Sequence, residues 1–208
     1  QLAQNQNRNK TNRELIHNTN EKLSATESKM EALRNITERY DGYGNSIRRV
    51  MEQKQWNPGI IGVVADIITV NQKYEVAVET ALGGSIQNIV TEDDATAKRM
   101  ISYLKTNRLG RATFLPLNTI TDRGSVRNDV LREKGVIGVA SDLVEVDSKF
   151  NTLVKNLLGR IIVVDNIDNA LAVARKNNQS LRLVTIEGEL INPGGSMTGG
   201  AFRNSSNL

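Results

Sequence analysis

The chain has 208 residues, of which 38% are hydrophobic and only 4% aromatic, enough for one globular domain of ordinary size with an appended segment. It contains no cysteine, which excludes disulfides and thiolate metal sites and indicates a reducing compartment. The 27 lysines and arginines outnumber the 23 acidic residues, and the resulting net charge of +4 permits an anionic partner without requiring one.

The residue patterns predict neither a membrane segment nor a catalytic centre. The first residues lack the apolar core of a signal peptide, and the apolar runs are far shorter than the roughly 20 residues that span a bilayer. The single histidine, His17, has no second metal ligand near it, and no serine-nucleophile or dinucleotide motif is present. We therefore expect a cytoplasmic protein that is not an enzyme, with no membrane partner, no cofactor and no metal.

Residues 1–38 contain neither glycine nor proline and are mostly polar. Apolar residues recur there at a spacing of seven with one gap, which predicts a long coiled-coil-type helix with a thin apolar seam. The seam residues are Leu2, Ile16, Leu23 and Met30. A helix this polar needs a partner, and none lies within residues 1–38, so a disordered tail is the alternative.

Glycine and proline mark the end of this segment. Gly42 and Gly44 predict the end of the helix, and Asn57-Pro58-Gly59 interrupts the chain again. We assign residues 1–40 to a coiled-coil arm helix and residues 41–58 to a junction.

An internal repeat begins after the junction. Residues 59–66 (GIIGVVAD) match residues 135–142 (GVIGVASD) 76 positions later, and the match continues at this offset as far as residue 83. One deletion later the offset becomes 75, which pairs Asp94 with Asn169. The two parts of the chain are therefore interpreted as copies of one unit, related by a pseudo-two-fold axis.

Each copy is predicted to contain a strand, a helix, a strand, a helix and a strand. The predicted elements are residues 60–64, 74–82, 86–90, 93–105 and 112–115 in the first copy, and 136–139, 150–158, 161–164, 167–176 and 181–186 in the second. Residues 185–191 continue the second copy as a strand or hairpin. This pattern predicts an α+β fold of two α/β halves, 59–118 and 135–208, joined by a linker over 119–134.

Asp66 and Asp142 occur at matching positions of the two copies. A pair of carboxylates can serve acid–base catalysis, but aspartates at repeated positions also act as turn or cap residues that accept backbone N–H bonds. We favour the turn or cap interpretation, since no nucleophile or base accompanies them.

Two glycine pairs lie near the end of the chain, in residues 192–200 (NPGGSMTGG). The glycines are Gly194, Gly195, Gly199 and Gly200. Glycine at such positions indicates a backbone with positive φ or a contact too close for a Cβ atom, although a flexible linker has the same composition. A phosphate-binding loop is disfavoured, because Gly200 and Ala201 stand where that motif has its lysine and hydroxyl residue.

One local run of bases contains no acidic residue between Asp94 and Asp122. Its candidate DNA-binding residues are Lys98, Lys105, Arg108 and Arg111. Such a patch suits the phosphates of a nucleic acid, although bases near a helix C-terminus are favourable in any helix.

Four motifs in this order resemble the hinge domain of the bacterial structural-maintenance-of-chromosomes (SMC) family. The motifs are PGIIG at 58–62, AVETALG at 77–83, GRATFLPL at 110–117 and NPGGSMTGG at 192–200. The resemblance covers roughly residues 40–208 and implies a hinge fold at the end of a long antiparallel coiled coil, with residues 1–40 as a stub of one arm.

The resemblance also implies partners. Hinges of this family form homodimers in which each half meets the other half of the partner, with strand pairing across the interface, and the four paired glycines match the glycines of that interface. DNA contact near the arms is implied as well, with Arg203 as a further candidate. The full-length protein would be a nucleoid-associated ATPase that binds kleisin-type subunits at its heads, and these heads are absent from this sequence.

Two functions are consistent with these patterns. The first is homodimerisation of a chromosome-condensing and chromosome-segregating ATPase, with a contribution to DNA binding. The alternative is a module that primarily binds DNA and dimerises only incidentally. An enzyme using Asp66 and Asp142 is a third and weaker hypothesis.

Overall fold

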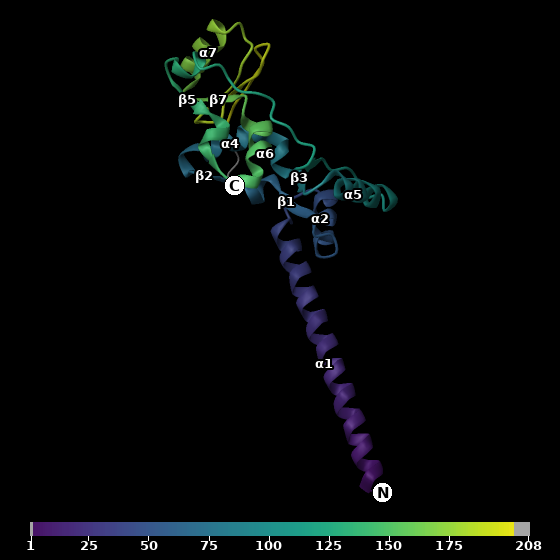
Figure 1. Ribbon diagram of the computed structural model, residues 1–208. Helices are drawn as coiled ribbons and strands as arrows, with labels where there is room; N and C mark the ends of the chain where they lie inside the picture. The colour runs from purple at the N-terminus through teal and green to yellow at the C-terminus, as the bar shows by residue number, and fades with distance from the viewer. Residues whose placement is uncertain (1, 202–208) are drawn as a thin grey trace.

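The computed structural model describes residues 2–201. Helix α1 (Leu2–Arg39) projects as a single rod from the remainder of the molecule (Figure 1). The seam residues Ile16, Leu23 and Met30 expose 58%, 55% and 67% of their surface. The side chain of Leu2, the fourth seam residue, is outside the described part. The predicted long helix is confirmed, and its apolar seam is open to solvent.

Two short helices connect α1 to the body, namely α2 (Asn45–Glu52) and the 3-10 helix η1 (Gln53–Gln55). Val50 and Met51 of α2 are buried together with Tyr40, which follows α1 directly. The end of α1 is therefore held in a small apolar core.

The rest of the chain forms two halves of similar element order. The first half contains β1 (Ile60–Val63), α3 (Val64–Ile67), β2 (Thr69–Val70), η2 (Gln72–Tyr74), α4 (Glu75–Leu82), η3 (Gly83–Gln87), β3 (Ile89–Thr91), α5 (Asp94–Thr106) and β4 (Phe114–Pro116). The second half contains η4 (Val130–Arg132), β5 (Val136–Val139), η5 (Ala140–Leu143), β6 (Val144–Glu145), η6 (Ser148–Phe150), α6 (Asn151–Leu158), β7 (Ile161–Val164), α7 (Ile167–Lys176), β8 (Arg182–Thr185), β9 (Leu190–Ile191) and β10 (Met197–Thr198). The predicted α+β class and the two α/β halves are confirmed.

Each half has its own sheet. The order is β1-β3-β4 in the first half and β10-β9-β8-β7-β5 in the second. In both sheets an antiparallel pair (β1 with β3, β5 with β7) is followed by a parallel pair (β3 with β4, β7 with β8). The second sheet is therefore the first sheet extended by two strands, β9 and β10.

A pseudo-two-fold axis passes between β2 and β6. These strands pair antiparallel, and Thr69 lies opposite Glu145. The two residues are 76 positions apart, which is the offset of the sequence repeat, so a residue pairs with its own counterpart. When two copies are related by a two-fold axis, residues on the axis lie opposite their own counterparts, as Thr69 and Glu145 do.

The predicted register of the repeat is wrong after the first helix of each half. Val90 pairs with Gly62 as Val163 pairs with Gly138, so the true offset there is 73 and not 75. The cause is η3, a 3-10 turn that adds three residues to the first half only. It also takes up Ile86 and Gln87 of the strand predicted at 86–90, which in fact begins at Ile89.

The largest core lies between the two halves. It joins Val78 and Leu82 of α4 to Leu153 and Leu158 of α6, and it includes Val163 of β7. In Figure 1, α4 and α6 occupy the middle of the body, with β1, β3 and α5 near the arm and β5, β7 and α7 at the far end. The halves thus share one core, which ties them together.

Residues 119–134, predicted as a linker, contribute one fully buried residue to the core. Val130 of η4 is 1% exposed and packs with Ile162 and Ile191 of the second sheet. The end of this segment is thus a packed part of the second half.

Candidate functional site

The paired glycines lie in a meander of two short strands at the end of the second sheet. The chain leaves β8 and returns as β9, so of the strand and the hairpin considered for residues 185–191 the hairpin is confirmed. A tight turn then leads to β10, where Asn192 N donates to Ser196 O at 2.9 Å. Gly194 N donates to Gln179 O at 2.8 Å, which fixes this turn on the end of the second half.

Three of the four glycines have backbone conformations that other residues rarely adopt. Gly194, Gly195 and Gly200 have φ values of +88°, +92° and +134°. Gly199 lacks this feature, but a Cβ atom there would lie 3.2 Å from Cγ of Glu189. Within the chain, positive φ explains the glycines better than close contact does.

The two sheets end in strands that have no second neighbour in the described residues. β10 is the outer strand of the second sheet, and Met197 on it is 52% exposed. β4 is the outer strand of the first sheet, and its Phe114 and Leu115 are the counterparts of Leu183 and Val184 in β8. In β8 these positions pair with β9, whereas the same edge of β4 is unpaired in the described chain.

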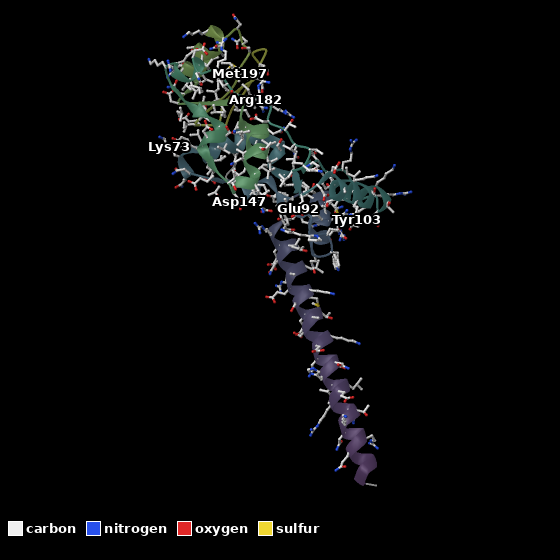
Figure 2. All side chains as sticks on the ribbon, in the orientation of Figure 1. Lys73, Glu92, Tyr103, Asp147, Arg182 and Met197 are labelled. Carbon is white, nitrogen blue, oxygen red and sulfur yellow. The ribbon has the colours of Figure 1, made fainter. Side chains whose placement is uncertain are left out.

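The basic run lies at the other end of the molecule, next to the arm. Lys98 and Lys105 are exposed on α5, and Arg108 and Arg111 follow it. Tyr103, labelled in Figure 2, marks this helix beside the end of α1. Arg203, the fifth candidate, lies outside the described residues.

Three of these bases, Lys105, Arg108 and Arg111, line one hollow of about 440 Å³, which we call the α5 hollow. Lys98 is not part of its lining. Ser46 Oγ of α2 donates to Arg111 O at 2.7 Å, so the hollow is fastened to the arm junction. Within residues 2–201 none of the four bases forms an ion pair, which leaves their charges available to an anion.

Arg108 has a strained backbone, with φ at +53°. It follows the end of α5, where Leu109 N donates to Leu104 O at 3.0 Å, the pattern of a Schellman cap. The matching cap after α7 places Asn178 at this conformation, with φ at +52°. Asparagine tolerates positive φ better than arginine does, so Arg108 is retained at a local cost.

A polar cluster at the base of the arm is a feature that the sequence analysis did not predict. Arg39 Nη2 donates to Asp66 Oδ1 at 2.7 Å, and the Tyr40 hydroxyl donates to the other oxygen of the same carboxylate. The Val63 N–H also donates to Asp66, at 3.3 Å, which agrees with the predicted cap role of this aspartate. Asp142, its counterpart, accepts only from Ser141, at 3.4 Å.

Burial and the nearby Asp66 carboxylate raise the pKa values of the two tyrosines in this cluster. Burial, followed by the hydrogen bond to Asp66, raises the pKa of Tyr40 well above its usual value. Burial also raises the pKa of Tyr43, whose ring meets that of Tyr40 edge-on at 5.3 Å. The Tyr40 hydroxyl therefore remains a donor at neutral pH.

The described residues contain no group of three histidine, cysteine or acidic side chains that could hold a metal ion. No helix in the same part of the chain has the length and apolar character needed to cross a membrane.

Comparisons with known proteins place the chain among the bacterial and archaeal SMC proteins. It is 40% identical over 188 residues to "Chromosome partition protein Smc" of Lactiplantibacillus plantarum, covering 89% of this chain and 16% of that protein. It is 37% identical over 199 residues to the protein of the same name from Bacillus subtilis, covering 94% of this chain and 17% of that protein. The chain thus spans only about a sixth of the length of these relatives.

Two solved hinge structures are similar to this chain. The crystal structure of an asymmetric dimer of the Geobacillus stearothermophilus SMC hinge domain matches with a TM-score of 0.75 at 36% identity, covering 91% of this chain and 79% of that one. The Pyrococcus furiosus SMC hinge domain matches with a TM-score of 0.64 at 35% identity, covering 86% of this chain and 96% of that one.

The family model for the "SMC proteins Flexible Hinge Domain" matches residues 57–174, more than half of the chain. This hinge is a non-catalytic domain, in agreement with the prediction that the chain is not an enzyme. On these matches, and on the fold that accompanies them, the chain belongs to the SMC family and carries its hinge domain.

Proposed function

We propose that this chain is a homodimerisation hinge, which joins the coiled-coil arms of two copies of a chromosome partition protein. The similar Geobacillus stearothermophilus hinge is described as a dimer, and the relatives in sequence are named for chromosome partition. In such a dimer, the arm helix α1 of each copy would be held in a fixed position relative to that of the other copy.

The observation that carries the proposal is the pair of unpaired sheet edges. Within residues 2–201, β4 lacks an outer neighbour at the position where its counterpart β8 pairs with β9, and β10 lacks one at the end of the other sheet. If β10 of one copy pairs with β4 of the other, a two-fold axis repeats the contact and closes the assembly. Closure also protects two edges that would otherwise promote aggregation.

In this arrangement Gly194, Gly195, Gly199 and Gly200 form the interface segment. The positive φ values of Gly194 and Gly195 shape the turn that presents β10, and Met197 of β10 offers an exposed apolar side chain. Loss of the turn would therefore misplace the pairing edge.

Analytical ultracentrifugation of chain 1–208 tests the proposal. The unaltered chain should sediment as a dimer at micromolar concentration, and Thr198→Lys on the β10 edge should shift it to monomer, because lysine on an edge strand opposes pairing. Thr152→Lys, on the exposed start of α6, is the matched control and should leave the dimer intact. A monomeric unaltered chain would contradict the proposal.

A second function is favoured by the hollow beside the arm. Lys105, Arg108 and Arg111 line it without ion-pair partners in the described residues, and Lys98 lies nearby on α5. We propose that this surface contributes to DNA binding, with Arg203 as a further contact. Binding should weaken steeply with salt, and Lys105→Glu with Arg111→Glu should abolish it in a fluorescence anisotropy titration. Retained affinity would show that this surface does not bind DNA.

The remaining expectations concern the whole protein. We propose that its full-length form is an ATPase with kleisin-type partners at its heads, located in the cytoplasm at the nucleoid. For this chain we propose the division into residues 1–40, 41–58, 59–118, 119–134 and 135–208. Limited proteolysis tests the division, since cleavage should concentrate within 119–128, before the buried Val130.

A further inference from the structure

A second basic site lies on the far half of the molecule, away from α5. A cavity of about 690 Å³ is lined by four arginines from separate parts of the chain, namely Arg123, Arg127, Arg160 and Arg182. We call it the arginine cavity. Its volume is in the range of pockets that bind small molecules. Arginines far apart in sequence converge here only through the fold.

Few negative charges offset these arginines. Arg127 forms an ion pair with Asp129 at 3.0 Å. Arg123, Arg160 and Arg182 form no ion pair within residues 2–201. Like charges around one cavity repel each other, and a bound anion relieves that repulsion.

Arg182 adds an independent sign of a missing acceptor. Its Nε is buried and has no hydrogen-bond partner in the described structure. A buried donor without an acceptor is costly and needs an explanation, of which a bound ion is one. The label for Arg182 in Figure 2 places it between the middle of the molecule and the β10 end.

A second cavity of about 260 Å³ shares Arg123 and Arg182 with the first and reaches Ser85, Asn88 and Thr113 of the first half. The basic lining therefore continues into a region of hydroxyl and amide groups. A ligand that carries several anionic groups for the arginines, and polar groups for the hydroxyl and amide side chains, would match the two cavities.

We propose that the arginine cavity binds the phosphate groups of a polyanion, either a free polyphosphate compound or a nucleic-acid backbone. Guanidinium groups suit phosphate because their planar donors bind two oxygens at once. The site is distinct from the α5 hollow, since the two share no lining residue. It goes beyond the proposed dimer, whose pairing strand β4 borders the second cavity at Leu115.

Isothermal titration calorimetry with inorganic tripolyphosphate tests the proposal on chain 1–208. The unaltered chain should bind, and Arg123→Gln with Arg160→Gln should weaken binding at least about tenfold, because two exposed charged donors are lost. The matched control is Arg99→Gln with Arg175→Gln, which removes the same charge from exposed positions outside the cavity. Circular dichroism of both variants checks that they fold.

An unaltered chain that binds no tripolyphosphate would overturn the proposal, and so would equal weakening in the control. A competing deoxythymidine oligonucleotide separates the two sources of phosphate. Displacement of tripolyphosphate would support a nucleic-acid backbone in the cavity. Failure to displace it, with binding still lost in the Arg123→Gln, Arg160→Gln variant, would support a free phosphate compound.

Discussion

The hydroxyl of Tyr40 donates a hydrogen bond to Asp66, and this contact joins the end of the arm helix to the first half of the hinge. Arg39 binds the other oxygen of the same carboxylate at 2.7 Å. Asp66 thus accepts hydrogen bonds from two consecutive residues at the end of the arm. Within residues 2–201, its counterpart Asp142 accepts a hydrogen bond from its neighbour Ser141 and none from the arm. The Asp66 carboxylate therefore fixes the position where the arm meets the body, whereas Asp142, at the matching position of the second half, does not.

The first prediction concerns Tyr40→Phe. At neutral pH this change should lower the free energy of unfolding by about 1.5–3 kcal/mol, because a buried hydrogen bond to a carboxylate is lost. The folded-state pKa of Tyr40 is raised, so its contribution is complete below the unfolded pKa near 10 and is lost as pH rises through the folded value. Urea unfolding at neutral pH and at about pH 11 should therefore show a smaller difference at the higher pH. Tyr103→Phe, which removes a tyrosine hydroxyl outside the polar cluster, is the matched control.

The second prediction separates stability from DNA binding at Arg108. Its φ of +53° suits asparagine better than arginine, so Arg108→Asn should stabilise the fold by about 0.5–1 kcal/mol. The same change removes a cation from the α5 hollow and should weaken DNA binding. Thermal unfolding and anisotropy measure the two effects. A loss of stability in Arg108→Asn would show that the cap conformation is not the strained one described.

The third prediction compares two of the paired glycines. Gly194→Ala should destabilise the chain by about 1–2 kcal/mol, because its φ of +88° lies in a region that residues with a Cβ atom rarely adopt. Gly199→Ala should cost less, since its backbone is ordinary and the nearest atom, Cγ of Glu189, belongs to a flexible side chain. Unfolding should be followed at several protein concentrations, because dimerisation adds a concentration-dependent contribution. Equal losses would contradict the conformational argument.

The fourth prediction concerns the segment between the halves. Val130→Ala should lower the free energy of unfolding by about 2 kcal/mol, because Val130 is 1% exposed and its truncation leaves a cavity beside Ile162 and Ile191. Val126→Ala, a partly buried neighbour, should cost less. Similar small effects from both changes would mean that this segment is not part of the core. Denaturant titration provides the comparison.

Periodicity and repetition made most of the fold predictable. The polar helix, the two α/β halves and the hairpin after β8 all follow from local patterns, and the repeat predicted the pseudo-two-fold relation. The register error after Gly83 arose because η3 adds three residues to one half only, and alignment of two diverged copies does not reveal where such an insertion lies.

The polar sites were less accessible to sequence reasoning. Asp66 was correctly interpreted as a cap, but its bond to Tyr40 joins residues 26 positions apart across a bend that no local pattern encodes. The four arginines of the arginine cavity are likewise spread over residues 123–182, and only folding brings them together. The positive φ of Arg108 could not be predicted from the sequence, because arginine rarely adopts that conformation.

The core shared by α4 and α6 has a mechanical consequence. Because both halves bury residues in one cluster, they cannot separate without unfolding the chain. A force applied along α1 enters through Arg39 and Tyr40 and spreads into that core. In the proposed dimer, the short strand contacts between copies would yield before the chain itself does. Tension on the arms would then open the assembly at its seams and leave each subunit folded and able to close again.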